Sequence, residues 1–317
     1  MKIISNFGKD SLRFKKVFLA IGVFDGVHLG HQALIKKVIA KAKSVGGTSA
    51  VMTFDPHPVQ VLHPTKAFPL LVTLPHRLKL IEELGADVCL VIRFTKKFSR
   101  LKPEEFIQNF LIKHVHPQEI FVGDDFRFGQ NRSGDLALFR SVAWKYHFKV
   151  NKTRAVRWQG EKISSTKIRQ LIADGNITEA SQLLGHSVSI LGRVVKGESR
   201  GKKLGFPTAN IEYHSEVIPP RGVYLVHVII KCNRLPALAN IGVRPTFKRK
   251  QEKNMKLEVH ILDFNQDIYQ REIVVEFVKK IRDERRFISA DQLIEQIKLD
   301  EKSARSYFMK PPSRGTS

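Results

Sequence analysis

Apolar runs and amphipathic segments alternate through the first 185 residues of the chain. The run from Val17 to Val23 is apolar enough for a buried strand, and apolar positions from Leu34 to Val45 recur at helical spacing. The alternation continues, with strands expected at 48–54, 87–92 and 119–122 and helices around 77–84 and from Pro103 onward. Such alternation predicts an α/β domain with a parallel sheet that helices cover on both faces.

The pattern changes after residue 185. Apolar runs then follow one another with only turns between them, at 188–195, 223–230, 235–241, 257–262 and 273–278. A helical pattern returns only at 290–299. This series predicts an antiparallel sheet or small β-barrel closed by a terminal helix. We therefore expect two domains, α/β over residues 1–185 and all-β over residues 186–317.

The link between the first strand and the first helix carries the most informative residues. It reads Gly22-Val23-Phe24-Asp25-Gly26-Val27-His28-Leu29-Gly30-His31. A helix start presents unpaired N–H groups and a positive dipole end, so this junction suits an anion such as phosphate. An aspartate and two histidines beside that anion predict a site for chemistry. A metal site of His28 and His31 is disfavoured, because no third ligand with suitable spacing is nearby and the glycines would be unexplained. On spacing alone, one other interpretation stays open: the histidines cap the helix while the glycines form a tight turn.

Polar residues also follow other predicted strands. Asp55-Pro56-His57-Pro58 comes after the second strand, and Gly123-Asp124-Asp125-Phe126-Arg127-Phe128-Gly129 after a later one. Ligands of parallel sheets bind beyond the carboxyl ends of the strands, where these residues are expected. Ser164-Ser165-Thr166 with Arg169 opens a further helix. One hydroxyl is enough for an N-cap, so three hydroxyls and an arginine predict a second phosphate-binding helix start.

The second half has a signature of its own, a basic glycine-rich segment that ends in Gly205-Phe206-Pro207-Thr208-Ala209-Asn210. Its portion from Gly197 to Lys203 lacks the spacing and the Lys-Ser/Thr ending of a Walker A loop, which we therefore reject. The simplest alternative is a solvated basic hairpin loop. That alternative does not explain why a hydroxyl and an amide end a rigid loop, as if to hold a metal ion or a phosphate.

Glu258 is ambiguous from pattern alone. Leu257, Val259 and Ile261 face one way in a predicted strand, so Glu258 and His260 are most simply the solvent face of an edge strand.

The net charge of +24 suggests a nucleic-acid partner at first sight. However, the positive excess occurs in both halves with the two signs interspersed, and most aromatic residues lie within apolar runs. This pattern fits a generally basic surface and polyanionic small substrates at least as well as a nucleic-acid groove, and we expect no nucleic-acid partner.

Both cysteines, Cys89 and Cys232, lie inside apolar runs and are expected to be buried, reduced thiols. We find no signal peptide and no apolar stretch long enough to span a membrane. We therefore expect a cytoplasmic protein without a membrane partner. The sequence predicts no particular oligomeric state.

In these motifs the chain resembles the bacterial bifunctional riboflavin kinase/FAD synthetases over nearly its whole length. The His-x-Gly-His portion is shared by all nucleotidylyltransferases, whereas its combination with Pro207-Thr208-Ala209-Asn210 is far more specific. Further matching segments are 54–58, 123–129 with Arg132 and Gly134-Asp135, 164–166 with Arg169, 222–224, 240–246, Glu258 with 263–269, and 282–287.

The resemblance implies a Rossmann-like FMN adenylyltransferase domain and a riboflavin kinase barrel. The barrel would transfer the γ-phosphoryl group of ATP to the ribityl hydroxyl of riboflavin, giving FMN. The N-terminal domain would then let the FMN phosphate attack the α-phosphorus of ATP, giving FAD and pyrophosphate. Both reactions imply Mg²⁺, because phosphoryl transfer depends on positioning and on neutralising spread charge.

The resemblance also implies residue roles. His28, His31 and Arg169 would be catalytic in adenylyl transfer, and Glu258 would be the base of the kinase. The implied ATP contacts are Gly22, Phe24, Asp25, Gly30, Ser164, Ser165 and Thr166 in the first half and Gly205, Pro207, Thr208 and Asn210 in the second. Thr208 and Asn210 would also hold Mg²⁺. Flavin-binding candidates are Asp55, His57, Asp124, Asp125, Arg127 and Arg282.

Two related alternatives are weighed against this one. A monofunctional FMN adenylyltransferase with a merely flavin-binding C-terminal domain conflicts with the intact Pro207–Asn210 segment and with Glu258. Pantetheine-phosphate and glycerol-phosphate nucleotidylyltransferases share the histidine motif but lack the second domain.

Overall fold

The computed structural model describes residues 1–5, 14–197, 201, 204–214, 216–243 and 255–309. The chain divides into two compact units, residues 1–165 and 166–317. Helices α7 (Ser165–Ala173) and α8 (Ile177–Leu184) come between this division and the boundary expected at residue 185, which stays a prediction. Each unit is described by itself below.

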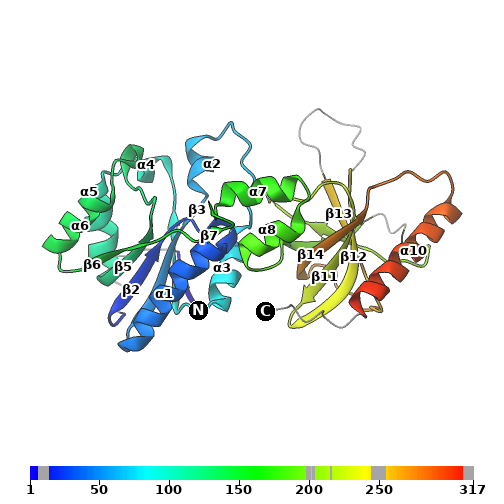
Figure 1. Ribbon diagram of the computed structural model, residues 1–317, viewed down its shortest axis with the longest axis horizontal. Helices are drawn as coiled ribbons and strands as arrows, with labels where there is room; N and C mark the ends of the chain where they lie inside the picture. The colour runs from blue at the N-terminus through cyan, green and yellow to red at the C-terminus, as the bar shows by residue number, and fades with distance from the viewer. Residues whose placement is uncertain (6–13, 198–200, 202–203, 215, 244–254, 310–317) are drawn as a thin grey trace. The chain divides into compact units, whose positions relative to one another are not determined.

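The first unit is built on a sheet of six parallel strands, in the order β1-β4-β3-β2-β5-β6. Its strands are β1 (Lys2–Ile4), β2 (Val17–Ile21), β3 (Thr48–Asp55), β4 (Val88–Arg93), β5 (Pro117–Gly123) and β6 (Lys149–Thr153). Strands β2, β3, β5 and β6 of this sheet are labelled in Figure 1. Every residue of β2 is buried. Val17, Leu19 and Ile21 belong to one apolar cluster, whereas Phe18 and Ala20 belong to another. The predicted parallel sheet with two covered faces is therefore confirmed.

Helices connect these strands. They are α1 (Leu29–Ser44), α2 (Pro58–Leu62), α3 (Leu74–Glu83), α4 (Lys96–Ser99), α5 (Pro103–Phe106) and α6 (Leu136–Lys145), with short 3-10 turns η1 (Asp25–Val27) and η3 (Gln130–Arg132). The helix expected from Pro103 changes after one turn into a π-helix, η2 (Ile107–Val115). A short hairpin of β7 (Arg157–Trp158) and β8 (Glu161–Lys162) precedes α7.

The second unit contains a closed antiparallel barrel with the strand order β10-β13-β12-β11-β14-β9. Its strands are β9 (Ser189–Val195), β10 (Ala209–Glu212), β11 (Gly222–Ile230), β12 (Asn233–Val243), β13 (Met255–Ile261) and β14 (Glu272–Arg282). The terminal helix α10 (Ala290–Phe308) is longer than the expected 290–299. Its Ala304 and Phe308 pack on an apolar cluster that includes Leu225 and Leu238. The predicted barrel with a terminal helix is confirmed.

The two cysteines differ in their surroundings. Cys89 is buried in β4, and burial raises the pKa of its thiol to about 12. Cys232 is exposed, which corrects the expectation that both thiols are buried. The apolar run ends at Ile230, and Lys231 and Cys232 form the turn between β11 and β12, with Lys231 in the left-handed region at φ 56°. Within the described residues no helix is both long and apolar enough to span a bilayer.

Candidate active sites

The first candidate site lies in the connection between β2 and α1. Phe24 and Gly26 have positive φ angles of 55° and 80°, which turn the chain sharply. A Cβ atom on Gly30 would lie 3.1 Å from the His28 ring, and one on Gly22 would lie 2.9 Å from the Phe24 ring. Larger residues at these two glycines would therefore displace the aromatic rings of the site.

His28 and His31 lie against each other at the start of α1. His28 is buried and caps the helix, since its Nδ1 accepts a hydrogen bond from the His31 backbone N–H at 3.4 Å. The two rings stack with centroids 3.5 Å apart. Burial, and then the neighbouring His28 and Arg77, lower the pKa of His31 well below its usual range. The capping interpretation is right for His28, while His31 is a neutral imidazole at a helix start, where an anion is favoured.

Asp25 stabilises the loop beside these histidines. Its buried carboxylate accepts hydrogen bonds from the backbone N–H groups of Leu71, at 3.0 Å, and Val72, at 3.3 Å. The structure thus shows Asp25 ordering a loop, and its role in binding ATP stays a prediction. Ser165, at the other end of this unit, donates a hydrogen bond from Oγ to the Asp25 carbonyl at 3.0 Å. One of the three predicted hydroxyl groups, that of Ser165, therefore lies at the turn that leads from β2 to His28 and His31.

Arg77 was missed by the sequence analysis. Its side chain is completely buried, and its Nη1 donates to the carbonyls of Val23 and Phe54 and to the Thr53 hydroxyl at 3.0–3.1 Å. One guanidinium group therefore joins the carboxyl ends of β2 and β3, where the site is built. Because Arg77 lies in an ordinary amphipathic helix, no local signal distinguishes it from a surface arginine.

The remaining candidates of this unit lie at the ends of β3 and β5. The Nδ1 atom of His57 caps α2 by accepting from the Val59 N–H at 3.1 Å. Asp124 and Asp125 both pair with Lys162 at 2.9 Å. Burial raises the pKa of Asp125, but the hydrogen bond and charge of Lys162 outweigh it and lower the pKa overall.

Arg127 pairs with Asp135 at 3.3 Å, and Asp135 caps α6. Asp55 is the last residue of β3, at the strand end where it was expected. Ser164 precedes α7, whereas Thr166 and Arg169 lie in that helix and belong to the second unit. The flavin and phosphate roles of all these residues stay predictions.

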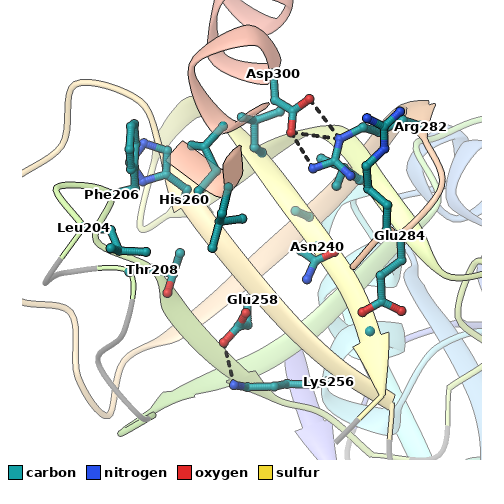
Figure 2. A pocket seen from close by; sticks show the side chains of 18 of the residues that line it. Leu204, Phe206, Thr208, Asn240, Lys256, Glu258, His260, Arg282, Glu284 and Asp300 are labelled. Carbon is teal, nitrogen blue, oxygen red and sulfur yellow. Dashed lines mark hydrogen bonds and ion pairs between the residues drawn. The ribbon is translucent and has the colours of Figure 1, made fainter. Parts of the chain in front are cut away.

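The second candidate site is a cavity of about 500 Å³ in the barrel unit. Its lining includes Thr208, Asn210, Asn240, Glu258 and Arg282, which come from segments far apart in the sequence. Figure 2 labels four of them, Thr208, Asn240, Glu258 and Arg282. The strand register explains how they meet, because Glu258 pairs with Asn210 on one side and with Asn240 on the other. Gly205 and Pro207 precede β10 in the loop that leads to Thr208.

Glu258 faces this cavity and does not lie on an edge strand. β13 has a neighbour on each side in the closed barrel, which rules out the edge-strand interpretation. Its odd-numbered residues, Leu257 and Val259, are buried, whereas Lys256, Glu258 and His260 line the cavity. The Nζ of Lys256 lies 2.6 Å from a carboxylate oxygen of Glu258 (Figure 2). This lysine is a second residue that the sequence analysis missed.

Arg282 forms part of the cavity wall and is fixed by α10. Its Nε and Nη2 atoms donate to the buried carboxylate of Asp300 at 2.7–3.0 Å, a two-pronged contact that orients the guanidinium group. The guanidinium carbon of Arg282 lies over the ring of Phe287, 6.0 Å from the ring centroid. Asp300 was also missed, because its partner is eighteen residues away and in another element.

Within the described residues no cluster of three or more His, Cys, Asp or Glu side chains could hold a metal ion. The oxygen donors Thr208 and Asn210 nevertheless line the cavity beside Glu258. Of the basic segment, 198–200 and 202–203 lie outside the described residues, as do residues 244–246 of the motif that begins at Asn240.

The chain combines a nucleotidyltransferase-type sheet and a β-barrel, and each of them has a polar site. This combination defines a class of two-domain enzymes that transfer phosphorus-containing groups. The comparisons with known proteins agree. The family model for FAD synthetase matches residues 11–167, and the model for riboflavin kinase matches residues 184–308.

Relatives match along most of the chain. A bifunctional riboflavin kinase/FMN adenylyltransferase of Escherichia coli K12 is 42% identical over 92% of this chain and 92% of its own. The bifunctional riboflavin kinase/FMN adenylyltransferase of Bacillus subtilis 168 is 38% identical over 92% of this chain and 93% of its own. A crystal structure from Streptococcus pneumoniae, described as a macrolide-efflux protein, has a TM-score of 0.82 and 32% identity, and the match covers 96% of this chain and 99% of that one.

The chain belongs to the family of bifunctional riboflavin kinases/FMN adenylyltransferases. The family predicted from the sequence is thereby confirmed. Because both family models match, each on its own part of the chain, the monofunctional alternative is not favoured.

Proposed function

We propose that the barrel phosphorylates riboflavin to FMN and that the sheet unit adenylylates FMN to FAD. The observation that carries this proposal is that each family match falls on a fold with its own polar site. The excess of positive charge suits substrates that carry several phosphates. We further propose that the protein acts in the cytoplasm on free small molecules and uses no nucleic-acid or membrane partner.

In the kinase site Glu258 is the general base. It accepts the proton of the ribityl hydroxyl while that oxygen attacks the γ-phosphorus of ATP, and ADP leaves. The position of Glu258 between Asn210 and Asn240, with Lys256 at 2.6 Å, supports this role because it fixes the carboxylate in the cavity wall. Arg282, oriented by Asp300, contacts the flavin.

Mg²⁺ fits this cavity through the hydroxyl of Thr208 and the side-chain carbonyl of Asn210. Both are oxygen donors, and Mg²⁺ commonly takes only one or two protein ligands together with waters and substrate phosphates. The absence of an acidic cluster among the described side chains is compatible with that mode. The ion would neutralise charge on the transferring phosphoryl group.

In the adenylyltransferase site the attacking group is already ionised. A phosphate oxygen of FMN attacks the α-phosphorus of ATP, and pyrophosphate leaves. His28, His31 and the start of α1 bind the phosphates, and the Ser164–Arg169 segment also binds the triphosphate. The lowered pKa of His31 supports a neutral imidazole that donates a hydrogen bond to the reacting phosphate.

The proposal is tested by incubating the protein with riboflavin, ATP and Mg²⁺ and separating the flavins chromatographically over time. We expect FMN to appear first and FAD to follow, and we expect neither product when Mg²⁺ is chelated. Supplying FMN in place of riboflavin should give FAD directly. If riboflavin gives no FMN although supplied FMN gives FAD, the kinase assignment is wrong.

A further inference from the structure

His260 connects the loop before β10 with the terminal helix α10. Its Nδ1 lies 2.7 Å from the carbonyl oxygen of Pro207, and its Nε2 lies 2.8 Å from a carboxylate oxygen of Glu301 on α10. The His260 and Glu301 side chains are 14% and 22% exposed, and the contact between them is partly buried, whereas the contact with the Pro207 carbonyl is exposed to water. The ring also meets Phe206 edge-on, with centroids 6.0 Å apart (Figure 2).

The contact with Pro207 lies just beyond the point where the backbone pairing of β10 with β13 ends. β10 begins at Ala209, which pairs with Val259, and one more step of the same register would place Thr208 opposite His260. No ladder bond reaches that far, since Thr208 precedes the strand. The His260 side chain therefore supplies the next attachment and holds the peptide that leads into Thr208.

Both partners of the ring are hydrogen-bond acceptors. The carbonyl of Pro207 can only accept, so Nδ1 carries a proton. The carboxylate of Glu301 is an acceptor as well, so the ring is held between two acceptors, one at each nitrogen. Glu301 thus fixes the ring orientation in which Nδ1 faces the Pro207 carbonyl.

We propose that His260 is a positioning residue of the kinase. Oriented by Glu301, it fixes the Pro207–Asn210 segment so that Thr208 and Asn210 meet the ATP phosphates and Mg²⁺ in the correct geometry. The inference rests on the proposed function of those two residues. It assigns His260 no contact with substrate, and it concerns only the kinase reaction.

The test measures initial rates of FMN formation by full-length His260→Phe, which keeps an aromatic ring beside Phe206 but cannot form either hydrogen bond. We expect KM for ATP to rise about tenfold to a hundredfold, the effect of losing one charge-assisted hydrogen bond. KM for riboflavin should stay within about twofold, because the proposed flavin contact, Arg282, lies in another element and is held by Asp300. FAD formation from supplied FMN should be unchanged.

Two variants of Glu301 sharpen the result. Glu301→Gln can still bond to Nε2 through its carboxamide, so KM for ATP should stay near the parent value. Glu301→Ala frees the ring to rotate and should raise KM for ATP, by less than His260→Phe. If the His260→Phe protein does not fold, KM for ATP of the Glu301→Ala protein tests the inference in its place.

Asp263 provides a matched control. It pairs with Arg305 at 2.7–2.8 Å and thus also joins the end of β13 to α10, but it has no bond to the Pro207 segment. Asp263→Asn should leave KM for ATP unchanged. The inference is wrong if His260→Phe leaves KM for ATP within twofold, or if Asp263→Asn raises it equally. A parent protein that makes no FMN would instead overturn the proposed function.

Discussion

The two candidate sites are built in opposite ways. In the sheet unit, His28 and His31 lie three residues apart, and one strand-to-helix turn brings their rings to 3.5 Å. In the barrel, Asn210, Asn240 and Glu258 come from three strands and meet only through their register. The first site is thus a local structure stabilised by hydrogen bonds of Arg77, whereas the second forms only when the barrel is closed. A substitution in one site should therefore abolish one activity and leave the other.

Replacing the proposed base should have the largest effect. Glu258→Gln keeps the shape of the side chain but removes the proton acceptor, so FMN formation from riboflavin should fall by about 10²–10⁴-fold. FAD formation from FMN should persist, because that reaction uses the other unit and an ionised nucleophile. The measurement is a pair of initial rates, with riboflavin and with FMN, on a variant whose melting temperature matches the parent. Equal loss in both rates would contradict the separation of sites.

His31→Ala should have the reverse selectivity. Removing one preorganised donor from a transition-state contact costs about 10²–10³-fold in rate. FAD formation should fall by that order while FMN accumulates from riboflavin. Chromatography of the flavins after a fixed time shows which product dominates. Unchanged FAD output would mean that His31 only packs against His28.

A smaller effect is expected at Asp25, where the structure shows a loop contact. Asp25→Ala leaves the N–H groups of Leu71 and Val72 without their acceptor, which should lower the free energy of unfolding of the sheet unit by about 1–3 kcal/mol. Asp25→Asn keeps one acceptor oxygen and should lose less. Denaturant unfolding measures the change, and riboflavin kinase activity at 25 °C is the control. A normal unfolding free energy with lost FAD synthesis would assign Asp25 to ATP binding instead.

The smallest effect should follow from separating the units. Fragments starting at residue 166 and at residue 186 both contain the whole barrel, and we expect each to convert riboflavin to FMN. The longer fragment should be more stable, because the buried face of α8, which includes Leu183 and Leu184, packs against β14. Thermal unfolding of the two fragments compares these boundaries. An inactive but folded barrel fragment would show that the kinase needs the first unit.

The same contrast explains what could be predicted from the sequence. The turn with His28 and His31 is local, so strand and helix patterns on either side were enough to predict it. The barrel as a class was also predictable from its apolar runs. The role of Glu258 was ambiguous, because a strand pattern does not show whether β13 has one neighbour or two. Asp300 was missed for a similar reason, since no local spacing relates it to Arg282.

Strand β10 shows a further limit of sequence patterns. It has only four residues, so it was interpreted as the end of a loop. Its pairing with β13 nevertheless places Asn210 beside Glu258. The buried Arg77 contact likewise joins two strand ends to a helix that begins some twenty residues after β3.

Complementation between two variants tests the independence of the sites most directly. Full-length His31→Ala and Glu258→Gln proteins are each supplied with riboflavin, ATP and Mg²⁺, alone and mixed. We expect the first alone to stop at FMN and the second alone to form almost no product. The mixture should form FAD, because FMN released by one protein is adenylylated by the other. A mixture that forms no more FAD than either variant alone would contradict two separate sites joined by a released intermediate.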